Sequence, residues 1–181
     1  MMQLTKNFTL QEFNPRGLEL GPVHVENFRL LAQNLQVIRD FLGRPVKITS
    51  GLRSEAGNSN LQGASKTSQH LFGEACDFVV SGLDAEGLDY VFHKILQLEL
   101  VLPNACAQII RESNGKGAEW IHMGLKTTRW LDVQKAVIAS PVINAVQKAK
   151  ATKRLTSCEC LTTPDAKTFT LVKHIPYGEF G

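Results

Sequence analysis

Residues 68–78 read SQHLFGEACDF, a stretch that is too polar for a core strand and too apolar for a solvated loop. It places an imidazole, His70, and a carboxylate, Asp77, on either side of Gly73. A metal ion would hold these two groups together, but two ligands do not make a site. The stretch therefore raises the question of whether the rest of the chain supplies a third ligand and a base.

Residues 119–122, which read EWIH, supply both. Two imidazoles and one carboxylate, from His70, Asp77 and His122, would leave a zinc ion with an open fourth position, which is the catalytic arrangement. Glu119 is then a candidate base that takes a proton from the attacking water and hands it to the leaving amine. Arg53 ends the segment SGLR and is a candidate cation for stabilising the oxyanion of a tetrahedral intermediate.

Glu119 and His122 are three residues apart, and a regular strand places such residues on opposite faces. Both can reach one metal only if the strand begins late or bulges. We therefore predict that Glu119 lies at the turn, before regular pairing begins. The pattern also differs from the helical H-E-x-x-H arrangement, in which two histidines share one helix face.

The sequence around these residues predicts an α+β domain with a small mixed or antiparallel sheet flanked by helices. Thr9 and Glu12 form a capping box that opens a short helix. Apolar residues at helical spacing predict a longer helix over 25–41, which Gly43 ends. The other predicted elements are a strand at 45–49, a long loop at 50–69, a strand at 77–80, a helix at 84–98 and hairpin strands at 107–112 and 119–125.

The sequence beyond residue 130 is harder to interpret, and we treat 131–181 as a basic C-terminal extension of a 1–130 domain. Residues 131–150 are predicted to be helical, with an interruption after which Pro141 occupies the first turn of a second helix. Residues 151–167 are predicted to be irregular, and a final strand is predicted at 168–175.

The charge is uneven along the chain, although the net value is only +3. From Lys126 to the end there are nine lysines and arginines against four acids, a balance of +5 that leaves −2 for the preceding residues. A basic tail suits an anionic partner such as cell wall, a membrane surface or nucleic acid, but a solvated helix face explains it equally well. Because no nucleic-acid-binding motif is present and aromatic residues are few, we expect no nucleic-acid partner.

The length of 181 residues and a hydrophobic content of 43% fit one globular domain with an appendage. No apolar run is long enough to cross a bilayer, and we expect no signal peptide at the N-terminus. The four cysteines form no CxxC pair, so we expect reduced thiols, with Cys76 and Cys106 acting as small buried residues.

Taken together, these motifs resemble the zinc D-Ala-D-Ala carboxypeptidases and related murein peptidases. Residues 68–77 carry SxHxxGxAxD, 119–122 carry EWxH and 50–53 carry SGxR, while FTLxEF at 8–13 is similar to the phage branch of that family. The resemblance covers roughly residues 7–125. Leu52 departs from it, because many members have an aromatic residue before the arginine.

The resemblance implies a hedgehog-like α+β fold with one zinc ion held by His70, Asp77 and His122. It implies that Glu119 is the general base and acid and that Arg53 contacts the substrate and the transition state. Ser68 would help to bind substrate, and we expect Trp120 to form a hydrophobic wall near the site. The implied activity is hydrolysis of peptidoglycan stem peptides, either as a D-Ala-D-Ala carboxypeptidase or as an L-Ala–D-Glu endopeptidase.

Three biological settings are compatible with the sequence. The favoured one is a phage lysin or a virion-associated wall hydrolase, present in the host cytoplasm before release or carried in the virion. The second is a virion structural or assembly protein that keeps the peptidase fold and contacts other virion proteins through the C-terminal extension. The third, which we rank lowest, is a bacterial cytoplasmic D,D-dipeptidase.

Overall fold

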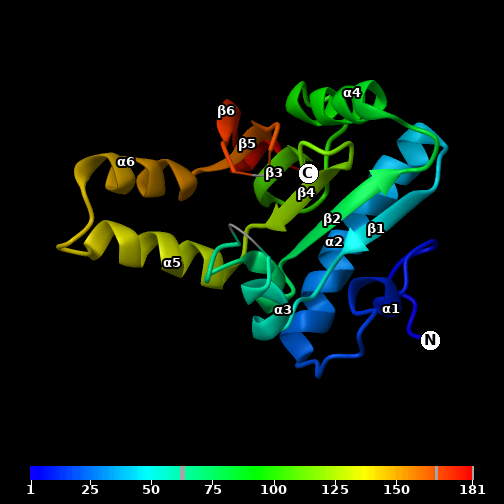
Figure 1. The fold of residues 1–181 in the computed structure, drawn as a ribbon, viewed down its shortest axis with the longest axis horizontal. Helices are drawn as coiled ribbons and strands as arrows, with labels where there is room; N and C mark the ends of the chain where they lie inside the picture. Colours follow the sequence, from blue (N-terminus) through cyan, green and yellow to red (C-terminus); the bar gives the residue numbers. More distant parts are fainter. Residues whose placement is uncertain (62–63, 166, 181) are drawn as a thin grey trace.

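The computed structural model describes residues 1–61, 64–165 and 167–180, and it shows a mixed α+β fold built on a six-stranded sheet (Figure 1). The sheet order is β1-β2-β4-β3-β5-β6, and every neighbouring pair is antiparallel except β3 and β5, which are parallel. The strands are β1 (Val46–Ser50), β2 (Ala75–Val80), β3 (Cys106–Ser113), β4 (Glu119–Leu125), β5 (Ser157–Thr163) and β6 (Thr170–Pro176). The predicted α+β class with a mixed sheet is therefore confirmed.

The N-terminal half follows the sequence predictions, except that the segment predicted as a long loop over 50–69 contains a short helix, α3. The helices there are α1 (Leu10–Phe13), α2 (Pro22–Leu42), α3 (Glu55–Ser59), the short 3-10 helix η1 (Gln69–Phe72) and α4 (Ala85–Leu96). The capping box of α1 is confirmed, because Glu12 accepts hydrogen bonds from the backbone N–H and the hydroxyl of Thr9. Gly43 ends α2 in the left-handed conformation, and Asp84 caps α4 through the N–H of Gly87.

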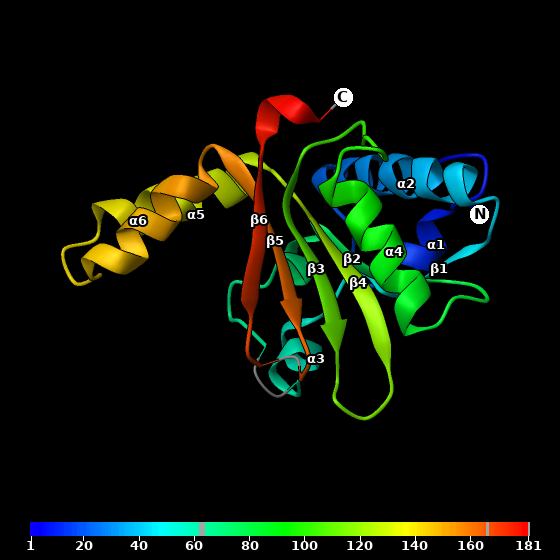
Figure 2. The same ribbon diagram turned by 90° about the horizontal axis from the view of Figure 1, so that it is seen from above.

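Helices α2 and α4 cover one face of the sheet and enclose the main core (Figure 2). The strands turn alternate residues to this face, and Ile109, Ile121 and Met123 are fully buried there. Burial of such side chains contributes roughly 25 cal/mol per Å² of apolar area removed from water. The opposite face of the central strands is left for polar side chains, and the site lies on that face.

The C-terminal extension differs from the prediction in its second half. Helix α5 (Thr128–Ala139) and helix α6 (Ala145–Arg154) form a hairpin that projects beside the sheet, and the 3-10 helix η2 (Tyr177–Glu179) follows β6 (Figure 2). The prediction of an irregular 151–167 segment is wrong, because α6 continues to Arg154 and β5 then pairs with β3. Pro141 lies between the two helices and not in the first turn of α6. The predicted final strand is confirmed as β6.

Three further sequence predictions concern the cysteines, the domain boundary and membrane-spanning segments. All four cysteines are buried and free, as predicted for Cys76 and Cys106. The domain boundary at residue 130 stays a prediction, and β5 and β6 extend the same sheet that β1–β4 form. None of the helices in the described part of the chain combines the length and apolar character that a membrane span requires.

Candidate metal centre

The sheet register and one tight turn bring the three predicted ligands together. Asp77 of β2 and His122 of β4 are direct partners across the antiparallel pair, so their side chains rise from the same face. His70 lies in η1, which Gly73 ends in the left-handed conformation with a φ of 62°. A Cβ at Gly73 would lie 2.9 Å from the Phe28 ring, so the turn that returns η1 to β2 requires glycine.

The donor atoms of this cluster converge at distances that suit a tetrahedral ion. The Nε2 atom of His70 lies 3.2 Å from Asp77 Oδ1 and 3.2 Å from His122 Nδ1, and the last two atoms are 2.8 Å apart. Zinc bonds of 2.0–2.2 Å at tetrahedral angles would hold such atoms about 3.3–3.6 Å apart, close to the longer of these separations. All three residues are buried, at 2%, 7% and 8% exposure. The cluster therefore fits a metal ion with two nitrogen ligands and one oxygen ligand.

The loop after β1 fixes the orientation of His70. Its Nδ1 lies 2.8 Å from the carbonyl oxygen of Gly51, and because a carbonyl only accepts hydrogen bonds, Nδ1 carries the proton. Nε2 is then the unprotonated atom, which faces the cluster. The backbone N–H of Arg53 also donates to the His70 carbonyl at 3.0 Å. A backbone acceptor that orients a metal-binding imidazole in this way is typical of metal sites.

Arg53 orients the carboxylate ligand. Its guanidinium donates to Asp77 Oδ2 at 2.7 Å and to the Ser50 hydroxyl at 3.0 Å, which leaves Asp77 Oδ1 for the two histidines. Burial by itself would raise the pKa of Asp77. When both rings carry a second proton, as they can without a metal ion, the charge of His70 and the hydrogen bonds from both imidazoles outweigh burial, so the pKa of Asp77 lies well below its usual range.

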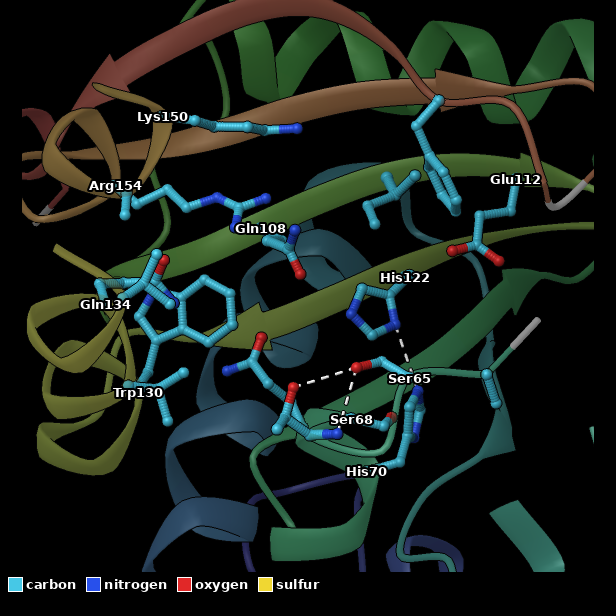
Figure 3. Close-up of a pocket in the computed structure, with 18 of the residues that line it drawn as sticks. Ser65, Ser68, His70, Gln108, Glu112, His122, Trp130, Gln134, Lys150 and Arg154 are labelled. Atoms are coloured by element: carbon cyan, nitrogen blue, oxygen red, sulfur yellow. Dashed lines mark hydrogen bonds between the residues drawn. The ribbon is translucent and has the colours of Figure 1, made fainter. Parts of the chain in front are cut away.

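The cluster lies at the floor of a cleft of about 810 Å³ (Figure 3). Ser68 and Trp120, which were predicted to contact substrate, both line the cleft together with Arg53. One wall comes from the C-terminal hairpin, because Trp130 of α5 and Arg154 of α6 also line it. The described residues thus form an open depression with an ion-sized cluster of donors at its base.

Glu119 is not placed as the sequence analysis expected. It is the first residue of β4 and pairs with Ser113, so the prediction that it precedes regular pairing is wrong. No bulge separates it from His122, and the alternation of the strand turns it to the opposite face. There its carboxylate forms an ion pair with Arg111, which also bonds Asp89 of α4.

Glu112 of β3 occupies the side of the cleft that Glu119 does not reach. Among the described residues, Asp77 and Glu112 are the acidic side chains that line the cleft. Burial raises the pKa of Glu112, and the charge of Asp77 adds to the effect while His122 and Arg53 oppose it. No motif in the sequence singles out this residue. With the hairpin register known, strand alternation would have placed Glu112 on the same face as Trp120 and His122.

Comparison with known proteins assigns the chain to a family. The sequence model described as Peptidase M15 matches residues 6–100, just over half of the chain. This range contains His70, Asp77 and Arg53. A comparison with curated proteins finds no match.

Proposed function

The chain belongs to the Peptidase M15 family, and from that premise we propose that it is a zinc-dependent peptidase that hydrolyses peptide bonds in peptidoglycan stem peptides. The observation that carries the proposal is the convergence of three buried donor atoms at the base of an open cleft. A fold of the D-Ala-D-Ala carboxypeptidase, hedgehog-like type is part of the same proposal.

His70, Asp77 and His122 would hold the ion in this proposal. A zinc ion bound by three protein ligands supplies Lewis acidity and lowers the pKa of water at its open position. Arg53 keeps Asp77 aligned and also lines the cleft, where its guanidinium can bond a substrate carbonyl oxygen. Ser68 adds a hydroxyl at the same rim.

The residues that line the cleft suit a short peptide substrate with carboxylate groups. Trp120 and Trp130 offer aromatic surface for aliphatic side chains. Lys150 and Arg154 line the hairpin wall and share Glu159 as a partner, which leaves one net positive charge there. Stem peptides combine small D-amino acids with acidic groups, so their chemistry matches both features. Carboxypeptidase and L-Ala–D-Glu endopeptidase activities remain alternatives within this proposal.

The proposed setting is a phage lysin or a virion-associated wall hydrolase. The similarity of FTLxEF at 8–13 to the phage branch of the family supports it. Contacts between the C-terminal extension and other virion proteins are part of the same proposal.

Mass spectrometry of muropeptides tests the activity. Purified murein is incubated with the zinc-loaded protein, with the chelated protein, and with the variants His122→Ala and His93→Ala. His93 is an exposed residue of α4 and serves as the matched control. We expect new fragments from the zinc-loaded protein and from His93→Ala only, and their masses identify the bond. Intact murein after incubation with folded, zinc-loaded protein would overturn the proposed function.

A further inference from the structure

We propose that Glu112, and not Glu119, is the carboxylate that moves the proton during peptide hydrolysis at this site. This inference rests on the proposed function and deepens it by naming the acid–base residue. One proton passes from the attacking water to Glu112 as the new C–O bond forms. The same proton passes from Glu112 to the leaving nitrogen as the C–N bond breaks. The second hydrogen of the water stays on the new carboxyl group until that group ionises.

The register of the β3–β4 hairpin places Glu112 on the same face of the sheet as His122. Ile110 is the direct partner of His122, and Glu112 is the direct partner of Trp120. Glu112 is therefore the diagonal neighbour of His122 on the same face of the sheet. Diagonal neighbours in an antiparallel pair lie roughly 7–8 Å apart at the backbone, which leaves room for one water between a glutamate and its neighbour. Figure 3 shows the Glu112 carboxylate directed into the cleft that holds both histidine rings.

The surroundings of Glu112 leave its carboxylate available. It is half-buried, and within the described part of the chain no ion pair holds it. The charged and titratable groups that act on it from the cleft are His122, Asp77 and Arg53. A carboxylate in a partly desolvated cleft beside a cationic cluster is the environment in which general bases operate.

The surroundings of Glu119 indicate a structural role. Its partner Arg111 is 6% exposed and donates to Asp89, to the Ala85 carbonyl and to Glu119. Glu119 thus neutralises a buried guanidinium that joins the sheet to α4. Turning Glu119 towards the cleft would strip a partner from that buried cation, which is costly.

Isosteric variants separate the two carboxylates. Glu112→Gln, Glu119→Gln and the exposed control Glu86→Gln are compared with wild type in the muropeptide assay. Zinc affinity and the binding of an uncleaved stem-peptide analogue are measured by calorimetry on the same samples. We expect Glu112→Gln to bind zinc and the analogue within about threefold of wild type while kcat falls about 10²- to 10⁴-fold. Glu86→Gln should match wild type, and Glu119→Gln should lower the melting temperature.

The outcomes distinguish this inference from the proposed function. If wild type cleaves murein and Glu112→Gln retains kcat, Glu112 is not the acid–base residue. A kcat loss in folded Glu119→Gln that equals or exceeds that of Glu112→Gln also overturns the inference. Glu112→Asp keeps a carboxylate on a shorter side chain, so its kcat should lie between those of Glu112→Gln and wild type. A kcat no higher than that of Glu112→Gln would contradict the inference. Inactive zinc-loaded wild type overturns both proposals together.

Discussion

Replacing Arg154 with methionine is expected to cost about 3 kcal/mol of unfolding free energy, because it leaves the Glu159 carboxylate charged and buried. Glu159 of β5 is 1% exposed, and its Oε2 atom accepts from Arg154 Nε at 2.7 Å and from Gln108 Nε2 at 3.3 Å. Lys150 is the other nearby cation, with its Nζ atom 4.0 Å from Oε1. The change therefore removes the nearer of the two cations.

The expected magnitude follows from these distances. At an effective dielectric constant of about 20, a charge pair at 2.7 Å gains about 6 kcal/mol before desolvation is counted. Removing one partner of a buried pair costs about 3–5 kcal/mol in measured cases. We place Arg154→Met at the lower end of this range, since the Arg154 side chain is 23% exposed and Lys150 remains.

The assay is a double-mutant cycle by urea denaturation. Wild type, Arg154→Met, Glu159→Gln and the double variant are each unfolded in urea. Provided that their m-values agree, the coupling free energy is calculated from the four unfolding free energies. We expect the double variant to lie within about 1 kcal/mol of wild type, because it removes the uncompensated buried charge. A cost below about 1 kcal/mol for Arg154→Met would mean that water or Lys150 compensates the Glu159 charge, and it would refute the reasoning that Arg154 is its main partner.

Three further predictions concern the site and the core. Gly51→Ala should lower stability by about 1–3 kcal/mol in thermal unfolding, because its Cβ would overlap the Phe13 carbonyl; Gly178→Ala, which meets open space, should not. Zinc at 100 times its Kd should stabilise the fold by about 2.7 kcal/mol and raise Tm by roughly 5–10 °C. His122→Ala should abolish that shift, and a wild-type Tm that is insensitive to zinc would contradict the site. Burial raises the pKa of the Cys106 thiol, so a thiol reagent at pH 8 should label it only after denaturation; rapid labelling of folded protein would show that it is exposed.

The convergence of the ligands was predictable because it depends on residue chemistry more than on exact geometry. An imidazole and a carboxylate around a glycine turn, with a second imidazole on a hairpin strand, have few stable arrangements that leave all of them buried. The structure brings His70, Asp77 and His122 together as expected. The backbone carbonyl of Gly51, which sets the protonated nitrogen of His70, could not be predicted, since it depends on how the loop after β1 packs.

The placement of Glu119 illustrates what local spacing cannot predict. The ExxH spacing led to Glu119, but the face of a strand residue is set by its parity and by any bulge, which the sequence does not reveal. The structure has no bulge between Glu119 and His122, so the even-numbered Glu112 and Trp120 share the cleft with His122. A sequence can indicate that a carboxylate is needed at a metal centre and still leave open which strand provides it.

Strand β5 was missed for a related reason. Strand β4 and helices α5 and α6 lie between β5 and its partner β3 in the sequence. The parallel pair is therefore not joined by a tight turn that a sequence motif could indicate. The strand also carries Glu159 at a buried position, which breaks the apolar pattern expected of an internal strand. That charge is tolerated because α6, whose cationic residues suggested a solvated tail, turns Arg154 and Lys150 towards it.

The same ion pair connects the C-terminal extension to the site. Gln108, which bonds Glu159, lies on β3 two positions before Ile110, the direct partner of His122. Glu112 follows on the same face of the same strand. β5 therefore supports the strand that carries the proposed acid–base residue, while α5 and α6 supply a wall of the cleft. The extension therefore contacts the site in two ways, through the cleft wall and through the strand pairing beside Glu112.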